Sequence, residues 1–459
     1  MGWRNLVKKK YTERARNILV NTIGIDVTIS YTLSTQVVNA VKGFISILFI
    51  SKYLSPQEQG FHYTFASITA LQVFFELGFS AIITQYAAHE KAHLTIQEKN
   101  IEGDEVHKNR LSSLLRLCIK WFGVMSIGLL ITLLIAGHSF FTHNPNETNV
   151  SWQMPWIIIC IGTAISLFIS PIFAFCEGLG QIQQIAKLRF YLSFIPAILY
   201  FLALYLGAKL YAAPISGLLN IVFLLAWLVY TDNKILLKNI WNNFSDVNKI
   251  SWRNEIFPYQ AKIAVSWISG YFMFQIMNPV IFSFFGAKAA GQMGMTLAIL
   301  YGLFGLVNAW IVTKVPLFSE LISRKEYSKL DNIFNIALKQ SVLILCVAAL
   351  TAIFGAYAIN YFDLVLKERL LPVLPFTIIM LTSLPMFINN SLATYLRCHK
   401  EEPYLVISIL SGLLSITLIY FSSKYMGLTA MTMSYFTVIS FATIGGYFIF
   451  KEKKKLWHQ

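Results

Sequence analysis

The chain has 459 residues, of which 56% are hydrophobic and 13% are charged, and its formal net charge is +15 at pH 7. A soluble globule of this composition would expose large apolar areas to water, so a soluble fold is excluded. Lipid must solvate much of the surface, and the positive charge then indicates membrane topology and attraction to anionic lipid rather than nucleic-acid binding.

The sequence predicts an all-α polytopic membrane protein with about 12 transmembrane helices. A helix needs roughly 20 apolar residues to cross a bilayer, and two early segments, Val27 to Leu54 and Phe61 to Ala88, have this length although Lys42 and Glu76 interrupt them. Ten later runs hold no Asp, Glu, Lys or Arg. In chain order they are Trp121 to Asn146, Thr148 to Cys176, Phe190 to Ala208, Leu210 to Thr231, Ile263 to Ala287, Ala289 to Thr313, Gln340 to Phe362, Leu370 to Leu396, Tyr404 to Ser423 and Tyr425 to Phe450.

Lysine and arginine are distributed unequally between the two sets of connecting segments. The segments 1–26, 89–116, 177–190, 231–256, 318–330, 397–402 and 451–459 hold 26 basic residues, whereas the intervening turns hold five. Because basic loops stay in the cytoplasm, both termini are predicted to be cytoplasmic. The basic N-terminus lacks the apolar core and cleavage site of a secretory signal, so we expect it to be retained in the mature protein.

The loop at 231–256 divides the chain into two predicted six-helix lobes, residues 1–235 and 236–459. Laying the start of the second lobe over the start of the first aligns the stretch through Gly60 with the stretch through Gly291. Each lobe would then begin with a helix, a tight turn and a second helix. Chance similarity between two apolar sequences is the alternative explanation.

One face of the first predicted helix is polar over about five turns. Its residues recur at steps of three or four and are Thr28, Thr32, Thr35, Gln36, Asn39, Lys42, Gly43 and Ser46. Polar groups are costly in hydrocarbon, so this face is expected to line a water-filled cavity or to meet other polar helices. Packing by small polar residues explains the threonines and the serine, but it does not explain a lysine in the middle of a span.

The second predicted helix repeats the pattern with Thr69, Gln72, Glu76, Ser80 and Thr84. A charge at a helix centre costs about 2.5–3.5 kcal/mol even on an insertion scale. Counting from the shared turn puts Lys42 and Glu76 at similar depths, so the two are either an ion pair between adjacent helices or contacts for substrate or protons.

Four further basic residues, Arg189, Lys262, Lys314 and Arg397, fall near predicted cytoplasmic helix ends. They either extend to the interface or form a basic vestibule for an anionic headgroup. The chain holds no GxxxxGK[ST] loop and no CxxC motif, and no predicted span carries paired carboxylates with the spacing of a metal or glycosidase site. We therefore expect no enzyme activity, no cofactor, no metal site and no disulfide.

Three stretches resemble the bacterial polysaccharide transporters, the O-antigen and capsule flippases of the multidrug/oligosaccharidyl-lipid/polysaccharide exporter (MOP) superfamily. They are Tyr53 to Glu90, Glu177 to Ile182 (EGLGQI) and Thr394 to Leu405. The resemblance implies two six-helix lobes around a central cavity, alternating access, a bacterial inner-membrane location, and a polyprenyl-diphosphate-linked oligosaccharide as substrate. Membrane lipids, and other proteins of polysaccharide assembly, would be its partners.

On this interpretation Lys42 contacts the diphosphate and Glu76, which matches the FFELGF stretch, is its charge partner or a proton-coupling group. Asn39, Gln36, Gln72, Lys262, Lys314, Arg189 and Arg397 complete the expected cavity lining. One alternative is a cation- or proton-coupled drug antiporter of the same superfamily, which needs carboxylates within the membrane. The other is a membrane glycosyltransferase or polymerase, which would need acid or base groups on a sizeable exterior loop.

Overall fold

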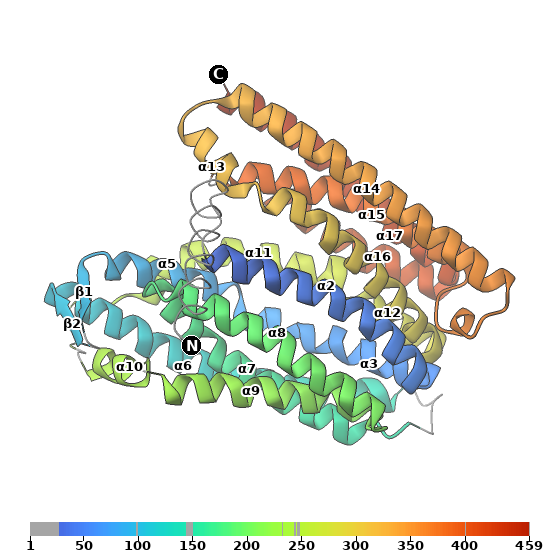
Figure 1. Ribbon diagram of the computed structural model, residues 1–459, viewed down its shortest axis with the longest axis horizontal. Coiled ribbons are helices and arrows are strands. Elements are labelled where there is room, and N and C mark those ends of the chain that lie inside the picture. Colours follow the sequence, from blue (N-terminus) through green and yellow to red (C-terminus); the bar gives the residue numbers. More distant parts are fainter. Residues whose placement is uncertain are drawn as a thin grey trace, which may run out of the picture.

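The computed structural model describes residues 27–97, 100–143, 150–231, 233–242, 245, 248–399 and 401–458, almost all of them helical (Figure 1). The helices of the first half are α2 (Val27–Tyr53), α3 (Pro56–Thr69), α4 (Val73–Glu76), α5 (Phe79–Lys91), α6 (Glu105–Thr142), α7 (Gln153–Gly178), α8 (Ile182–Tyr205), α9 (Ala212–Tyr230) and α10 (Asn233–Asn242). Those of the second half are α11 (Phe257–Phe274), α12 (Met277–Val312), α13 (Val315–Ser323), α14 (Tyr327–Tyr361), α15 (Val373–Arg397), α16 (Leu405–Tyr425) and α17 (Leu428–Trp457).

The described residues contain ten helices that are long and apolar enough to cross a membrane, or 11 if the bent pair α3–α4 and α5 counts as one span. One of the ten, Ile263–Ser323, is 61 residues long, about three times the length that one crossing needs. Its helical backbone breaks inside α12 at Gly286, where φ is 81° and ψ is 177°. If this segment crosses the membrane twice, once on each side of Gly286, and the bent pair also counts as one span, the total is the predicted twelve.

The second span is not one continuous helix. The 3-10 turn η1 (Ala70–Gln72) and then α4 continue α3, but Leu77 and Gly78 both adopt left-handed backbone, with φ of 51° and 68°. The two helical parts on either side of this break differ in direction by 42°. A glycine tolerates this conformation, whereas a leucine adopts it at a cost. Glu76 is therefore the last residue before a break, not the middle of a regular helix.

The sharp start of α3 follows from its sequence, SPQE. The Ser55 hydroxyl accepts a hydrogen bond from the Glu58 backbone N–H at 3.1 Å, and the Glu58 carboxylate accepts one from the Ser55 N–H at 2.8 Å. This reciprocal capping gives partners to two backbone N–H groups that have none within the helix. Pro56 supplies the fixed φ that the first helical turn requires. The chain reverses here within two residues, and we call this side of the molecule the Ser55 end.

The opposite side carries elements that hydropathy did not predict. Strands β1 (Leu94–Gln97) and β2 (Asn100–Gly103) pair antiparallel between α5 and α6, and α10 lies in the loop that separates the halves. The predicted all-α fold class is confirmed, and this short hairpin is a local addition to it. Figure 1 places β1, β2 and α10 together, and we call this side the hairpin end.

The two halves meet most closely at the Ser55 end, where α3 packs along α12. A Cβ on Gly294 would lie 2.2 Å from the Tyr63 ring, so only glycine permits this approach. Toward the hairpin end, the helices α14, α15 and α17 diverge from those of the first half (Figure 1).

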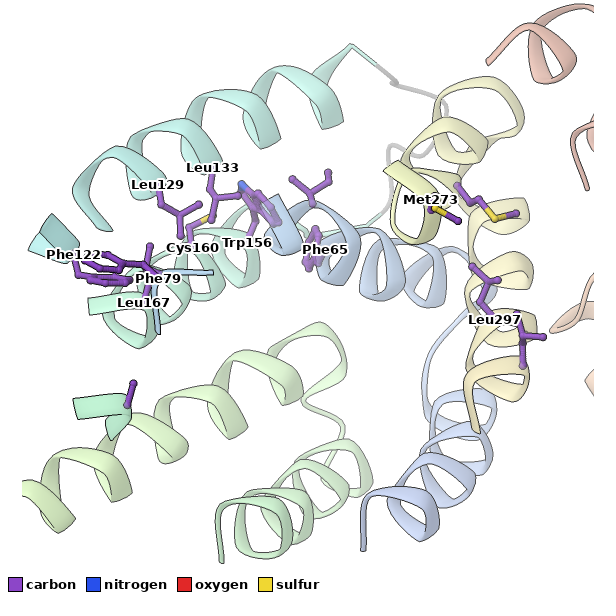
Figure 2. Packing of buried hydrophobic residues seen from close by; sticks show 14 of the residues in the cluster. Phe65, Phe79, Phe122, Leu129, Leu133, Trp156, Cys160, Leu167, Met273 and Leu297 are labelled. Carbon is purple, nitrogen blue, oxygen red and sulfur yellow. The ribbon is translucent and has the colours of Figure 1, made fainter. Parts of the chain in front are cut away.

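The apolar core of the first half fills the space between α3, α6 and α7. Figure 2 shows Phe65 of α3 and Trp156 of α7 in this cluster, with Leu129 and Leu133 of α6 beside them. The Phe65 and Trp156 rings are 5.1 Å apart between centroids, and a Cβ on Gly137 would meet the Trp156 ring at 2.3 Å. This packing holds α3 against α6 and α7, and α12 of the second half packs along α3 as well.

Candidate functional site

Helix α2 exposes two faces that lie on opposite sides of the helix and differ in chemistry. One consists of the polar residues Thr32, Gln36 and Asn39. The other consists of Val37, Val41, Phe44 and Leu48, which are 44–62% exposed. Lipid suits the apolar face, and the polar face needs water or a polar ligand. Between them α2 packs along α8 and α12. The cavity-lining role of the polar stripe stays a prediction.

The polar stripe divides into satisfied and available groups. The Thr32 and Thr35 hydroxyls donate to the carbonyl oxygens of Thr28 and Tyr31 in their own helix, at 2.9 and 2.8 Å. Within the part of the chain that the structure describes, the side chains of Gln36, Asn39 and Lys42 have no hydrogen-bond or ion-pair partner. Lys42 is half-buried beside this face. These three side chains are the ones that a ligand could contact.

The proposed ion pair between Lys42 and Glu76 is not formed among the described residues. The physical reason is helix packing: α2 lies mainly along α8 and α12 and meets α3 only near their shared turn. Lys42 and Glu76 therefore belong to helices that are not close neighbours at this depth. Glu76 remains half-buried at the break of the second span, and the two residues are independent candidates.

A cavity of about 430 Å³ lies inside the first half, between α3, α7 and α9. Two of the residues that line it, Thr69 and Gln72, belong to the polar stripe predicted on the second span. Its other polar lining residues are His62, Thr163, Ser166 and Asn220. None of its described lining residues is an aspartate, glutamate, lysine or arginine. Hydroxyls and amides with apolar walls suit a neutral polar ligand. The hydropathy pattern did not predict His62, Thr163, Ser166 and Asn220 as lining residues, because they belong to three helices that only the fold brings together.

The basic residues assigned to the cavity differ in their surroundings. Arg189 binds Glu177 with contacts of 2.8 and 3.1 Å, and Arg397 binds Glu402 with contacts of 2.9 and 3.1 Å. Both pairs lie at helix ends, and they favour the interfacial explanation over a free vestibule for these two arginines. Lys314 precedes α13 and is half-buried. Lys262 belongs to α11, but its side chain lies outside the described part.

A buried charge cluster joins the halves at the hairpin end and was also missed. Glu90 is 1% exposed and accepts from Arg110 Nε at 2.9 Å, while its other oxygen lies 2.7 Å from His107 Nδ1. Arg110 also donates to Glu255, which precedes α11, at 2.6 Å, and Tyr86 donates to the Glu255 carbonyl at 2.8 Å. Glu90, His107 and Arg110 fall in the connecting segment 89–116 and Glu255 in the segment 231–256, so only the fold brings the two segments together. No three described His, Cys, Asp or Glu residues could hold a metal ion.

No family model matches the chain, and no curated protein matches its sequence. Solved structures match its fold over nearly its whole length. The inward-facing structure of a multidrug resistance MATE family transporter of the MOP superfamily has a TM-score of 0.60 at 16% identity and covers 91% of this chain and 98% of its own. The outward-facing structure of such a transporter gives 0.59 at 13% identity, with 94% and 97% covered.

A third match is a MOP superfamily transporter from Pyrococcus furiosus, described by the reversed polarity of its binding pocket. Its TM-score is 0.57 at 15% identity, with 94% of this chain and 96% of that chain covered. At these identities the comparisons establish the fold and leave the cargo open. The chain has the all-helical, multi-pass fold of the MATE transporters of the MOP superfamily.

Proposed function

We propose that the chain is a membrane transporter that works by alternating access. It spans a bacterial inner membrane with its hairpin end facing the cytoplasm. The observation that carries this proposal is the polar face of α2, which lies on a span-length helix opposite a separate, lipid-compatible apolar face. A helix that borders a water-filled passage on one side and lipid on the other would carry both faces. The excess of basic residues at the hairpin end supports the orientation, and the MATE fold supports the mechanism.

The comparisons favour a small-molecule cargo that is exchanged against an ion, because two of the matched structures are those of multidrug resistance transporters. In such an antiporter a carboxylate within the membrane binds the coupling ion. Glu76 is the described carboxylate that best fits this role, because it lies within a span, at a helix break and outside any described ion pair.

A second candidate function is flipping of a polyprenyl-diphosphate-linked oligosaccharide, and two observations favour it. Lys42 lies beside the polar face of α2 and has no ion-pair partner among the described residues, which suits a diphosphate. The 430 Å³ cavity offers hydroxyl and amide groups without a described carboxylate, which suits sugars better than cations.

Reconstitution into liposomes tests both candidates. For an antiporter, an imposed proton or sodium gradient drives accumulation of a fluorescent lipophilic cation, and Glu76→Gln abolishes it. For a flippase, a labelled lipid-linked oligosaccharide becomes accessible to an impermeant glycosidase, and Lys42→Gln abolishes this exposure. Activity in neither assay, with protein that is folded and inserted, would contradict the proposed function.

A further inference from the structure

Two cavities at the hairpin end form one groove across the first turn of α8. The first has a volume of about 630 Å³ and lies between the β1 strand, the end of α7 and the start of α8. The second, of about 490 Å³, lies between α8, the end of α9 and Asn233. Gln181 and Gln184 line both, so we treat them as one feature, the α8 groove.

The α8 groove is positively charged. Its lining includes Lys91 and Lys187 and, among the described residues, no aspartate or glutamate. Neither lysine forms an ion pair within the described part of the chain. The Lys91 ammonium lies over Gly180, where a Cβ would be 3.6 Å from Nζ. Helix α8 begins at Ile182 without a side-chain cap, so its first N–H groups add to the positive potential.

A buried acceptor without a partner lies at the junction of the two cavities. Gln181 donates from Nε2 to Asn233 Oδ1 at 2.5 Å, and Asn233 donates in turn to the Thr231 hydroxyl at 2.9 Å. These two bonds fix the amide, and its Oε1 is then buried with no hydrogen-bond partner. A buried acceptor of this kind costs free energy unless a donor reaches it. A ligand hydroxyl is such a donor, and an anion alone is not.

The groove lies at the level of four span ends. α5, α7 and α9 end beside it and α8 begins there, and Tyr230, the last residue of α9, is 89% exposed. Tyr191 and Trp227 complete an aromatic wall, and such side chains mark the membrane interface. A ligand here can keep its acyl or prenyl chain in the bilayer while its headgroup enters the groove.

We infer that the α8 groove is a binding site for a lipid headgroup that carries both a phosphate and hydroxyls. The phosphate lies between Lys91, Lys187 and the N-terminus of α8, and a hydroxyl donates to Gln181 Oε1. Two sources supply this chemistry: a bilayer phospholipid with a glycerol headgroup, or the sugar phosphate of a lipid-linked cargo. No residue of α2 lines this site, and only the second source depends on which cargo the protein transports.

Native mass spectrometry of the purified, detergent-solubilised chain tests the inference, with phosphatidylglycerol and phosphatidylmethanol as probes of equal charge that differ in their hydroxyls. Wild type is expected to bind phosphatidylglycerol more tightly than phosphatidylmethanol. Changing Lys91→Gln together with Lys187→Gln should weaken binding of both about tenfold. Gln181→Leu should remove only the preference for phosphatidylglycerol, since it leaves the charge unchanged.

The matched control changes Lys234→Gln and Lys238→Gln, two lysines of α10 at the same end of the molecule and outside the groove lining. It removes the same charge and should leave binding unchanged. Equal weakening in this control, or equal affinity of wild type for both probes, would overturn the inference. Adding a lipid-linked sugar diphosphate separates the sources: displacement of phosphatidylglycerol identifies cargo as an occupant, and retention identifies the bilayer lipid.

Discussion

Gly60 and Gly291, which the sequence repeat aligns with each other, lie in contact where the two halves of the chain meet. A Cβ on Gly60 would be 1.9 Å from the carbonyl oxygen of Ala287, and a Cβ on Gly291 would be 2.9 Å from that of Pro56. The same alignment lays Ala287 over Pro56, so the two contacts are related by a two-fold exchange of the halves. The repeat proposed from sequence therefore has a structural counterpart, and this glycine contact closes the Ser55 end.

We predict that Gly60→Ala lowers the melting temperature, because the added methyl group overlaps the Ala287 backbone and overpacking costs about 1–3 kcal/mol. The measurement is thiol labelling during heating, since Cys118, Cys160 and Cys176 are buried until the chain unfolds. Gly302→Ala is the control: it lies in α12 with nothing within 4 Å of its Cβ position, and should be neutral or stabilising. Equal melting temperatures for Gly60→Ala and wild type would contradict the contact.

Gln59 is predicted to hold the Ser55 end closed. Its side chain is 1% exposed and donates to the carbonyl oxygens of Gly291 at 2.7 Å and Arg369 at 3.1 Å, both in the other half. Gln59→Leu removes both hydrogen bonds between the halves, which contribute about 0.5–1.5 kcal/mol each. Spin labels at the exposed residues Lys209 and Lys367 should then report a population at longer distance.

Gln292 provides the matched control for Gln59. It donates to the Glu368 carbonyl at 3.1 Å, but both residues belong to the second half. Gln292→Leu should leave the spin-label distances unchanged. A shift of the same size in both variants would indicate a local packing effect. It would contradict the prediction that Gln59 holds the Ser55 end closed.

Lys42 and Glu76 are predicted to act independently, because the described structure places no ion pair between them. For lipid-linked oligosaccharide flipping, Lys42→Arg should retain much of the activity and Lys42→Gln should lose it, since arginine keeps the charge and the phosphate affinity. Adding Glu76→Gln to Lys42→Gln should not restore transport. Near-wild-type transport in the double variant would show that the lysine only neutralises the glutamate.

The limits of sequence-based prediction are visible in the second span. Hydropathy located most spans, and it placed a boundary at Lys288, close to the actual break at Gly286. The break at Leu77 and Gly78 was missed, because a single glycine in an apolar helix pattern is usually tolerated. The ion pair considered for Lys42 and Glu76 is absent among the described residues for a different reason. Adjacent helices in sequence were assumed to be neighbours in space, whereas α2 packs along α8 and α12.

Glu255 is predicted to make stability at the hairpin end dependent on pH. Burial alone would raise the pKa of its carboxyl, but the Ser251 N–H and the Arg110 guanidinium outweigh burial and place the pKa below its ordinary value. A carboxyl with a depressed pKa stabilises the fold above the pKa of the unfolded chain, about 4.3. That stabilisation is lost as the pH falls through the folded pKa.

Glu255→Gln should therefore lower the melting temperature at pH 7, and the difference from wild type should shrink at about pH 4 and below. Glu402→Gln is the comparison, because Glu402 pairs with Arg397 at the surface, where their side chains are 43% and 52% exposed. Such a pair contributes little, so this variant should melt like wild type at both pH values. A deficit for Glu255→Gln that does not change with pH would contradict the assignment.

Cysteine accessibility along α2 tests the central claim, a water-filled passage beside this helix, most directly. In a background without the native cysteines, Gln36→Cys and Asn39→Cys should react rapidly with a membrane-impermeant thiol reagent added from the hairpin side. Val37→Cys, Val41→Cys and Leu48→Cys, on the opposite exposed face, should react slowly because lipid covers them. Equal slow labelling at all five positions would contradict the passage, since the polar face of α2 would then be sealed from water.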